Sequence, residues 1–110
     1  MIARIWRTGL RAERAADYEQ FATTRSLPMF RRQDGCLGVL FAEGSGEGIV
    51  ITLWDSIEAV ARLDKSAEYH QTAAALSDSG VLDGDQTVRM YWVTGGFLDP
   101  QVPLVDDRTR

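Results

Sequence analysis

The sequence predicts an α+β fold in which a four-stranded antiparallel sheet carries helices on one face, in the ferredoxin-like order β-α-β-β-α-β. Three observations predict this order. Four stretches alternate between apolar and polar residues or are rich in β-branched residues, two amphipathic stretches lie between them, and a glycine-rich segment links the two middle strands. With 110 residues, of which 45% are hydrophobic, the chain has the size of one domain with a real core.

The N-terminal third predicts a strand followed by a helix and a short helical turn. Residues 1–7 alternate as a strand does, and Thr8 with Gly9 would end it. From Ala12 onward, small and aromatic apolar residues recur at helical spacing, which predicts an amphipathic helix. Pro28 is expected to stop or restart that helix, with a fresh short helical turn from about Leu27 to Arg32.

The middle of the chain predicts a hairpin whose second strand runs directly into a helix. Residues 36–42 and 48–54 have strand character, and the glycines between them form the connection. A phosphate-binding loop is excluded because no helix start or lysine follows those glycines. Trp54 closes the second strand, and Asp55 with Glu58 forms the reciprocal capping pair that begins a helix. This junction is expected to place the Trp54 ring at the mouth of the space between sheet and helices.

The last third predicts a further helix and a final strand. Ser66 can cap this helix, whose buried face is formed by Tyr69, Ala73 and Leu76. A turn is expected at residues 83–85, and the final strand at residues 86–93.

The chain is expected to divide into residues 1–96, which form the domain, and residues 97–110, which form a C-terminal arm or tail. The arm carries several apolar side chains, which is unusual for a solvated tail. We therefore expect it to cross onto a second copy of the chain.

Composition excludes several kinds of partner. The formal net charge of −4 argues against nucleic acid, because phosphate binding needs a concentrated positive surface. No apolar run has the length of a membrane span or the pattern of a signal peptide. Cys36 is the sole cysteine, so no internal disulfide is expected and a cytoplasmic location fits. No metal-ligand spacing and no organic cofactor motif is visible, so neither is expected.

The strands carry more apolar bulk than one set of helices can cover. Strand alternation assigns Trp6, Val50, Trp54 and Tyr91 to one face of the sheet. The other face is expected to hold Ile5, Val39, Phe41, Ile49, Ile51, Leu53, Val88, Met90 and Trp92. Because an apolar sheet face in water would be a large sticky patch, we expect a homodimer that packs sheet against sheet.

The opening MIARIWR, the element order and the strand-to-helix passage LWDSIEAV resemble the antibiotic biosynthesis monooxygenase family over roughly residues 1–93. The resemblance implies a dimeric α/β barrel. It also implies a cofactor-independent monooxygenase acting on a quinol, an anthrone or a similar phenolic substrate. The alternative is a non-catalytic dimer of the same fold that binds a small aromatic ligand or serves a structural role.

The family's functional residues match this chain only in part. Trp54 matches the pocket tryptophan of the anthrone oxygenases, but Val50 and Val60 stand where those enzymes have asparagine and tyrosine. The haem-degrading members need an asparagine, a tryptophan and a histidine. This chain contains no asparagine, and Leu63 and Ala73 occupy the other two positions. Haem degradation is therefore not expected.

The resemblance places a ligand pocket beside Trp54 on the helix-covered face. Aromatic walls with a few convergent polar groups are typical of small-molecule sites. The predicted ligand-binding residues are Trp54, Trp6, Arg4 and Thr52. Alternatively, both tryptophans are core residues and the arginines reach solvent at the ends of the sheet.

Three further residues are candidates for catalysis. Arg89 could stabilise an anion, and Tyr91 would lie beside it. His70 is the sole histidine and could act as a general base, because imidazole changes its charge near neutral pH. The alternative for His70 is an exposed helix residue, since it lies one position from the predicted buried stripe.

Overall fold

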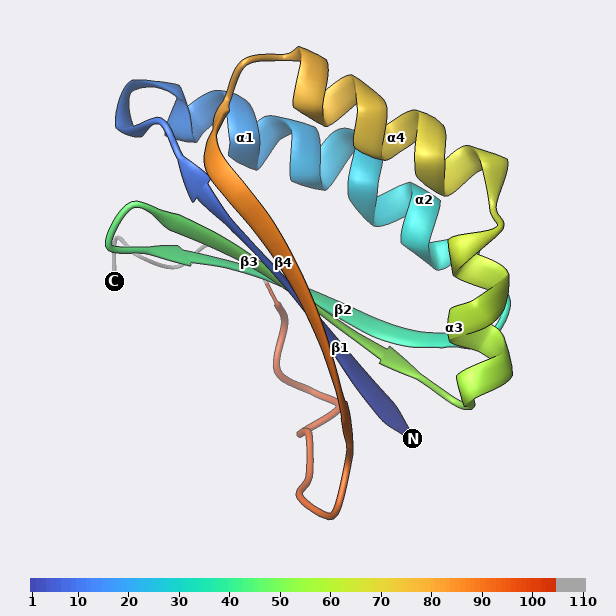
Figure 1. Ribbon diagram of the computed structural model, residues 1–110. Coiled ribbons are helices and arrows are strands. Elements are labelled where there is room, and N and C mark those ends of the chain that lie inside the picture. The colour runs from blue at the N-terminus through green and yellow to red at the C-terminus, as the bar shows by residue number, and fades with distance from the viewer. Residues whose placement is uncertain (105–110) are drawn as a thin grey trace.

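The computed structural model describes residues 1–104 and shows one four-stranded antiparallel sheet, in the order β2-β3-β1-β4, with its helices on one face (Figure 1). The strands are β1 (Ile2–Leu10), β2 (Cys36–Gly44), β3 (Glu47–Trp54) and β4 (Leu82–Trp92). The helices are α1 (Ala15–Phe21), α2 (Leu27–Arg31), α3 (Ile57–Asp64) and α4 (Ala67–Asp78), with a short 3₁₀ turn over Ala12–Arg14. The predicted fold class is confirmed.

The helix before β2 is longer and more continuous than predicted. The predicted helical turn at about Leu27 to Arg32 is confirmed as α2, with Pro28 in its first turn. A π-helical segment, Ala22–Ser26, joins α1 to α2, so Pro28 does not stop the helix. Proline lacks the amide donor that an uninterrupted α-helix would need at that point. The wider π turn just before it absorbs this loss of a hydrogen bond, which is how the helix passes the proline.

Several element ends differ from the predictions because tertiary pairing extends the strands. Thr8 and Gly9 do not end β1, and residues 83–85 are not a turn but part of β4. Gly9 pairs with Asp83 after a shift in register, which is a β-bulge that sequence alternation cannot locate. The predicted hairpin is confirmed, with Ser45 and Gly46 both at positive φ as a tight two-residue turn requires.

Helices α3 and α4 each begin directly after a serine that caps the helix N-terminus. Ser56 caps α3, because its hydroxyl accepts a hydrogen bond from the amide of Ala59 at 3.1 Å. The predicted capping pair of Asp55 and Glu58 is therefore wrong by one residue. The predicted cap of α4 is confirmed, since the Ser66 hydroxyl accepts from the amide of Tyr69 at 3.2 Å.

The central strand β1 determines which side chains share a face. Arg4 pairs with Thr52 on β3 and with Met90 on β4, so these three side chains lie on one face. Arg4 and Thr52 are buried beneath the helices. This face of the sheet is thus the helix-covered face.

The register corrects the predicted face assignment of β4 and β2. Arg89 pairs with Ile5 and Tyr91 pairs with Ala3, so both point to the open face and not toward Trp6. The residues that prove to lie on the helix-covered face are Val39, Phe41, Val88, Met90 and Trp92. A register slip of one residue moves every side chain of a strand to the other face, and the register shifts in β2 and β4 cannot be located from alternation alone.

Beyond β4, the described chain from Val93 to Leu104 forms no helix or strand, and Figure 1 shows it running on the side of the sheet away from the helices. Its side chains Phe97 and Leu98 are strongly exposed. The predicted arm at residues 97–110 is described only as far as Leu104. No helix in the described part of the chain is long and apolar enough to cross a membrane.

Candidate functional site

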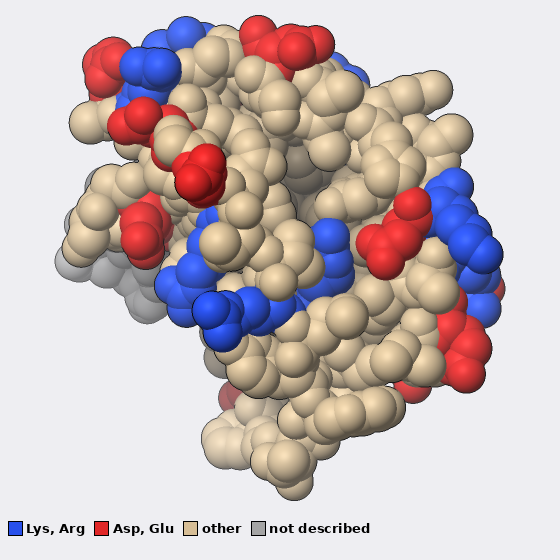
Figure 2. Space-filling view, viewed as in Figure 1, with Lys and Arg blue, Asp and Glu red and all other residues tan. Residues whose placement is uncertain are grey.

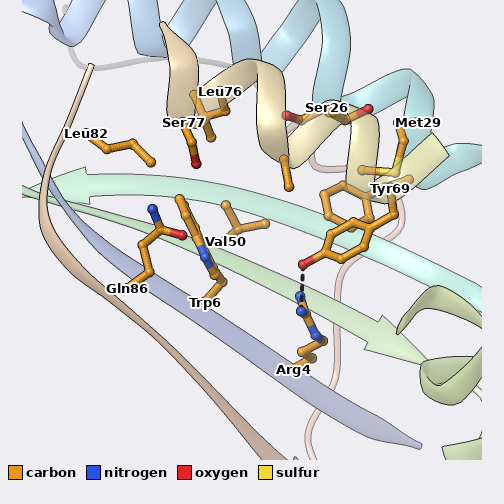
Figure 3. Close-up of a pocket in the computed structure, with 13 residues that line it drawn as sticks. Arg4, Trp6, Ser26, Met29, Val50, Tyr69, Leu76, Ser77, Leu82 and Gln86 are labelled. Carbon is orange, nitrogen blue, oxygen red and sulfur yellow. Dashed lines mark hydrogen bonds between the residues drawn. The ribbon is translucent and has the colours of Figure 1, made fainter. Parts of the chain in front are cut away.

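A cavity of about 100 Å³ lies between the helices and the middle of β1 and opens to solvent as a hollow near the centre of the face seen in Figure 2. Strand β1 supplies its floor, α4 and α2 supply its roof, and β4 contributes one side (Figure 3). Its walls are formed by Arg4, Trp6, Ser26, Met29, Phe30, Val50, Tyr69, Thr72, Ala73, Leu76, Ser77, Leu82 and Gln86.

One end of the cavity holds a pair formed by an arginine and a tyrosine. The Nη2 atom of Arg4 donates a hydrogen bond to the Tyr69 hydroxyl at 2.8 Å, which is drawn as the dashed line in Figure 3. The guanidinium carbon lies 5.3 Å from the centroid of the Tyr69 ring. Because the tyrosine oxygen accepts from Arg4, its own proton remains available for a ligand.

The Arg4 guanidinium is buried without an opposite charge. The residue is only 6% exposed, and none of the ion pairs among the described residues includes it. Of the five N–H donors of a guanidinium, only one has a side-chain hydrogen-bond partner among those residues. A buried charge costs free energy unless it is paired. This end of the cavity is thus suited to an anionic oxygen.

Buried polar contacts lie behind Arg4 in the core. The Trp54 indole donates to the Thr52 hydroxyl at 2.8 Å, and that hydroxyl donates to the backbone carbonyl of Arg4 at 3.4 Å. Thr52 and Trp54 are both 0% exposed and do not line the cavity. Trp54 is therefore a core residue rather than a wall of the cavity. Together these contacts tie the Arg4 backbone to the neighbouring strand.

The other end of the cavity is also polar, and its middle is apolar. Gln86 on β4 reaches upward beside Trp6, and Ser77 on α4 points down toward it from the roof (Figure 3). Between the two ends, the walls are mainly aromatic and aliphatic, with Trp6 and Val50 in the floor. An aromatic ring with an oxygen substituent directed at Arg4 matches this distribution.

The cavity contains no strong proton acceptor. Among the described residues that line it, none carries a carboxylate, an imidazole or a thiol. His70, predicted as a general base, is exposed and places its Nε2 atom 2.6 Å from the backbone carbonyl of Asp64. It does not line the cavity. The predicted placement of His70 at the site is thus not observed.

Arg89 and Tyr91 also lie away from the cavity. Both side chains project from the open face of β4, on the opposite side of the sheet from Arg4. Of the seven predicted site residues, only Arg4 and Trp6 line the cavity, and Thr52 with Trp54 support Arg4 from behind. Catalysis by His70, Arg89 or Tyr91 has no geometric basis in this cavity.

Two residues that line the cavity, Tyr69 and Gln86, were not predicted from the sequence as site residues. Tyr69 was expected on the buried stripe of α4, and it does lie there with Ala73 and Leu76, but its hydroxyl meets Arg4. Gln86 was expected only as the start of the last strand. The spacing of the buried stripe of α4 could have indicated Tyr69. The register between β1 and β4 could have indicated Gln86, but the sequence alone does not give that register.

The Cys36 thiol and the metal-ligating side chains of the described residues offer no second reactive site. Burial raises the pKa of the Cys36 thiol, and a backbone hydrogen bond at Gly38 lowers it by a smaller amount. A thiol with a raised pKa is a poor nucleophile. Within residues 1–104, no three side chains of the metal-ligating types gather at one point.

The fold matches solved structures. A proposed antibiotic biosynthesis monooxygenase from Deinococcus radiodurans superimposes with a TM-score of 0.71 at 22% identity, over 90% of this chain and 98% of the other. SnoaB from Streptomyces nogalater, a cofactor-independent oxygenase solved as a point mutant, gives 0.72 at 15% identity, over 89% and 97%. A proposed antibiotic biosynthesis monooxygenase from Bordetella bronchiseptica gives 0.73 at 18% identity, over 84% and 96%.

The structural matches establish the fold, which is that of proteins named as antibiotic biosynthesis monooxygenases, and they confirm the resemblance at that level. No protein-family model matches the sequence, and no curated protein matches it either.

Proposed function

We propose that this protein, which has the fold of the antibiotic biosynthesis monooxygenases, is a cofactor-independent monooxygenase whose substrate carries an ionisable oxygen on an aromatic ring. The observation that carries the proposal is the Arg4 guanidinium, which is buried in the wall of an aromatic cavity without a described carboxylate beside it. A phenolate or enolate oxygen would supply the missing charge and would accept from both Arg4 and Tyr69.

In this mechanism, Arg4 favours the anionic form of the substrate. A cation in a partly water-excluded cavity stabilises an oxyanion more than it does in water. No titratable base faces the cavity, so the substrate would enter as its anion or release its proton to solvent as Arg4 binds the oxygen. Trp6 would hold the ring, and Tyr69 would donate a second hydrogen bond to the same oxygen.

The redox balance needs no cofactor if the substrate itself is the reductant. In the keto form of an anthrone-type substrate, the carbon opposite the oxygen is a methylene, and ionisation of that oxygen removes one of the two methylene hydrogens as a proton. One atom of O₂ becomes the carbonyl oxygen at that carbon, and the other leaves as water with the two methylene hydrogens. The four electrons come from the substrate, whose anion is electron-rich enough to react.

The absence of a base among the cavity residues also favours a second candidate, a ligand-binding protein without catalysis. The two candidates share the anion site and differ only in oxygen consumption.

The protein would act as a homodimer. The open face of the sheet presents partly buried apolar residues of the two central strands, Ile5, Ile49, Ile51 and Leu53, which nothing on the helix side covers. A second copy packed sheet against sheet would bury them. Sedimentation at micromolar concentration checks this, and a stable monomer would contradict it. The cytoplasmic location expected from the sequence stays a prediction.

The test of function is oxygen uptake with a panel of quinols, anthrones and hydroxynaphthoquinols. We expect uptake with at least one compound, and we expect Arg4→Gln to abolish it. Arg7→Gln is the matched control, because Arg7 lies on the same strand but is exposed and only loosely paired with Glu47 at 3.9 Å. Tight binding without uptake for every compound would favour the non-catalytic candidate, and absence of both would reject the site.

A further inference from the structure

The helix-covered face of β4 carries three apolar side chains that no helix covers. Val88 is 48% exposed, Met90 is 51% exposed and Trp92 is 68% exposed, and we refer to these three residues as the β4 strip. They occupy alternate positions of one strand, so their side chains form a single row. Met90 and Trp92 pair with Arg4 and Ile2 on β1, and these two partners are buried. The helices therefore cover the sheet as far as β1 and stop short of β4.

The β4 strip begins where the cavity wall ends. Gln86 lines the cavity and lies on the same face of β4, two residues before Val88. Val88 pairs with Trp6 and Met90 pairs with Arg4, and both of those partners line the cavity. In Figure 2, basic side chains lie directly below the central hollow, and the surface farther down, where β4 runs toward the tail in Figure 1, is almost entirely uncharged. The cavity and the strip thus form one continuous surface.

The size of the cavity makes such an extension necessary for most ligands. An engineered protein cavity of about 150 Å³ binds benzene. The cavity here is smaller, at about 100 Å³, but it is open at its mouth, so it takes at most one ring and any further part of a ligand must lie outside. The apolar surface that meets it there is the β4 strip.

We propose that the β4 strip binds an apolar chain attached to the ring that occupies the cavity, so that the ligand is an aromatic oxyanion with an alkyl or acyl extension. This inference rests on the proposed function, because it takes the anion site at Arg4 as the anchor. The second copy of the chain is expected on the opposite face of β4, where Arg89 and Tyr91 point, and it would leave the strip open.

The test uses 2-hydroxy-1,4-naphthoquinone, which is an anion at neutral pH, and its 3-methyl, 3-butyl and 3-octyl derivatives. Binding is measured by calorimetry with the full chain. A chain lying on a half-exposed surface loses about half its contact with water, so we expect affinity to rise about twofold for each methylene. The four residue steps from Val88 to Trp92 span about 13 Å, which is longer than an extended octyl chain, so the gain should continue through the octyl derivative.

Matched variants of β4 separate the strip from the anion site. The double variant Val88→Thr and Met90→Thr should abolish the dependence on chain length and leave the affinity of the unsubstituted quinone unchanged. Tyr91→Thr is the control, because Tyr91 is as exposed as Met90, at 51%, but lies on the other face. It should leave the chain-length dependence intact.

Two outcomes would overturn the inference while leaving the anion site standing. The first is tight binding of the unsubstituted quinone with no gain from longer chains. The second is loss of the dimer in the double variant, measured by sedimentation, which would assign the β4 strip to contact between copies. If no quinone in the series binds, the proposed function fails, and the inference fails with it.

Discussion

The two ends of the space between the helices and the sheet are built from similar residues but differ in how their polar groups are satisfied. At the Trp54 end, the indole is fully buried and its N–H group has a partner in Thr52. At the Arg4 end, a buried charge has a single neutral partner beside a cavity. The first arrangement is typical of a core, and the second is typical of a binding site. In this protein, the buried charge of Arg4 therefore marks the candidate site more specifically than the aromatic side chains do.

The largest expected effect is on stability at the filled end. Trp54→Ala should lower the free energy of unfolding by about 3 to 5 kcal/mol, because it leaves a large cavity in the core. Trp6→Ala should cost clearly less, since Trp6 is only partly buried and already borders a cavity. Urea unfolding followed by circular dichroism measures both. Equal losses would mean that the two tryptophans play the same structural role.

A buried hydroxyl elsewhere shows what the protein tolerates when the group is neutral. The Tyr18 hydroxyl has no hydrogen-bond partner among the described residues, and burial, with a smaller contribution from Glu43, raises its pKa from 10.0 to about 12. The raised pKa means that the unfolded chain loses this proton first as pH rises. The Tyr18 contribution should therefore be fully present below pH 10 and decline by up to about 3 kcal/mol between pH 10 and 12.

Tyr18→Phe isolates that effect. The variant should be as stable as the parent at neutral pH, or more stable by about 1 kcal/mol, because it removes an unpaired polar atom. Its unfolding free energy should fall less steeply above pH 10 in denaturant titrations. An unchanged alkaline slope would show that Tyr18 does not carry it.

Loss of the Thr52 hydroxyl, which contacts both the Trp54 indole and the Arg4 carbonyl, should lower the free energy of unfolding by a smaller amount. Thr52→Val keeps the shape of the side chain but leaves the Trp54 N–H group without its acceptor, which should cost about 1 to 3 kcal/mol. The variant also loses the contact to the Arg4 carbonyl, so ligand affinity should fall modestly as well. Thr87→Val, at an exposed position of β4, is the control and should change neither quantity. Unaltered stability in Thr52→Val would mean that the indole finds another partner.

The smallest effect is expected at His70. His70→Ala should change stability by no more than about 0.5 kcal/mol, because the residue is exposed and bonds only to a backbone carbonyl. Any oxygen uptake should keep its pH profile in this variant. A lost limb of that profile would restore His70 as the base.

The fold could be predicted from sequence because its determinants are local. Strand alternation, the Ser66 cap and the hairpin glycines each act within a few residues, and their order defines the topology. The faces of β4 could not be predicted, because they depend on the register in which β4 pairs with β1. The site depends on the same register, so Arg4 and Trp6 were found while Gln86 was missed and Arg89 was assigned to the wrong side.

The central claim is that Arg4 makes the cavity an anion site, and 4-nitrophenol tests it most directly. This single-ring ligand suits the size of the cavity, and its hydroxyl ionises near neutral pH. Calorimetric titration across that ionisation should show the affinity of the parent protein rising at least tenfold as the ligand becomes an anion. Arg7→Gln should show the same rise, and Arg4→Gln should show none. An affinity in the parent protein that does not change with ligand ionisation would contradict the account.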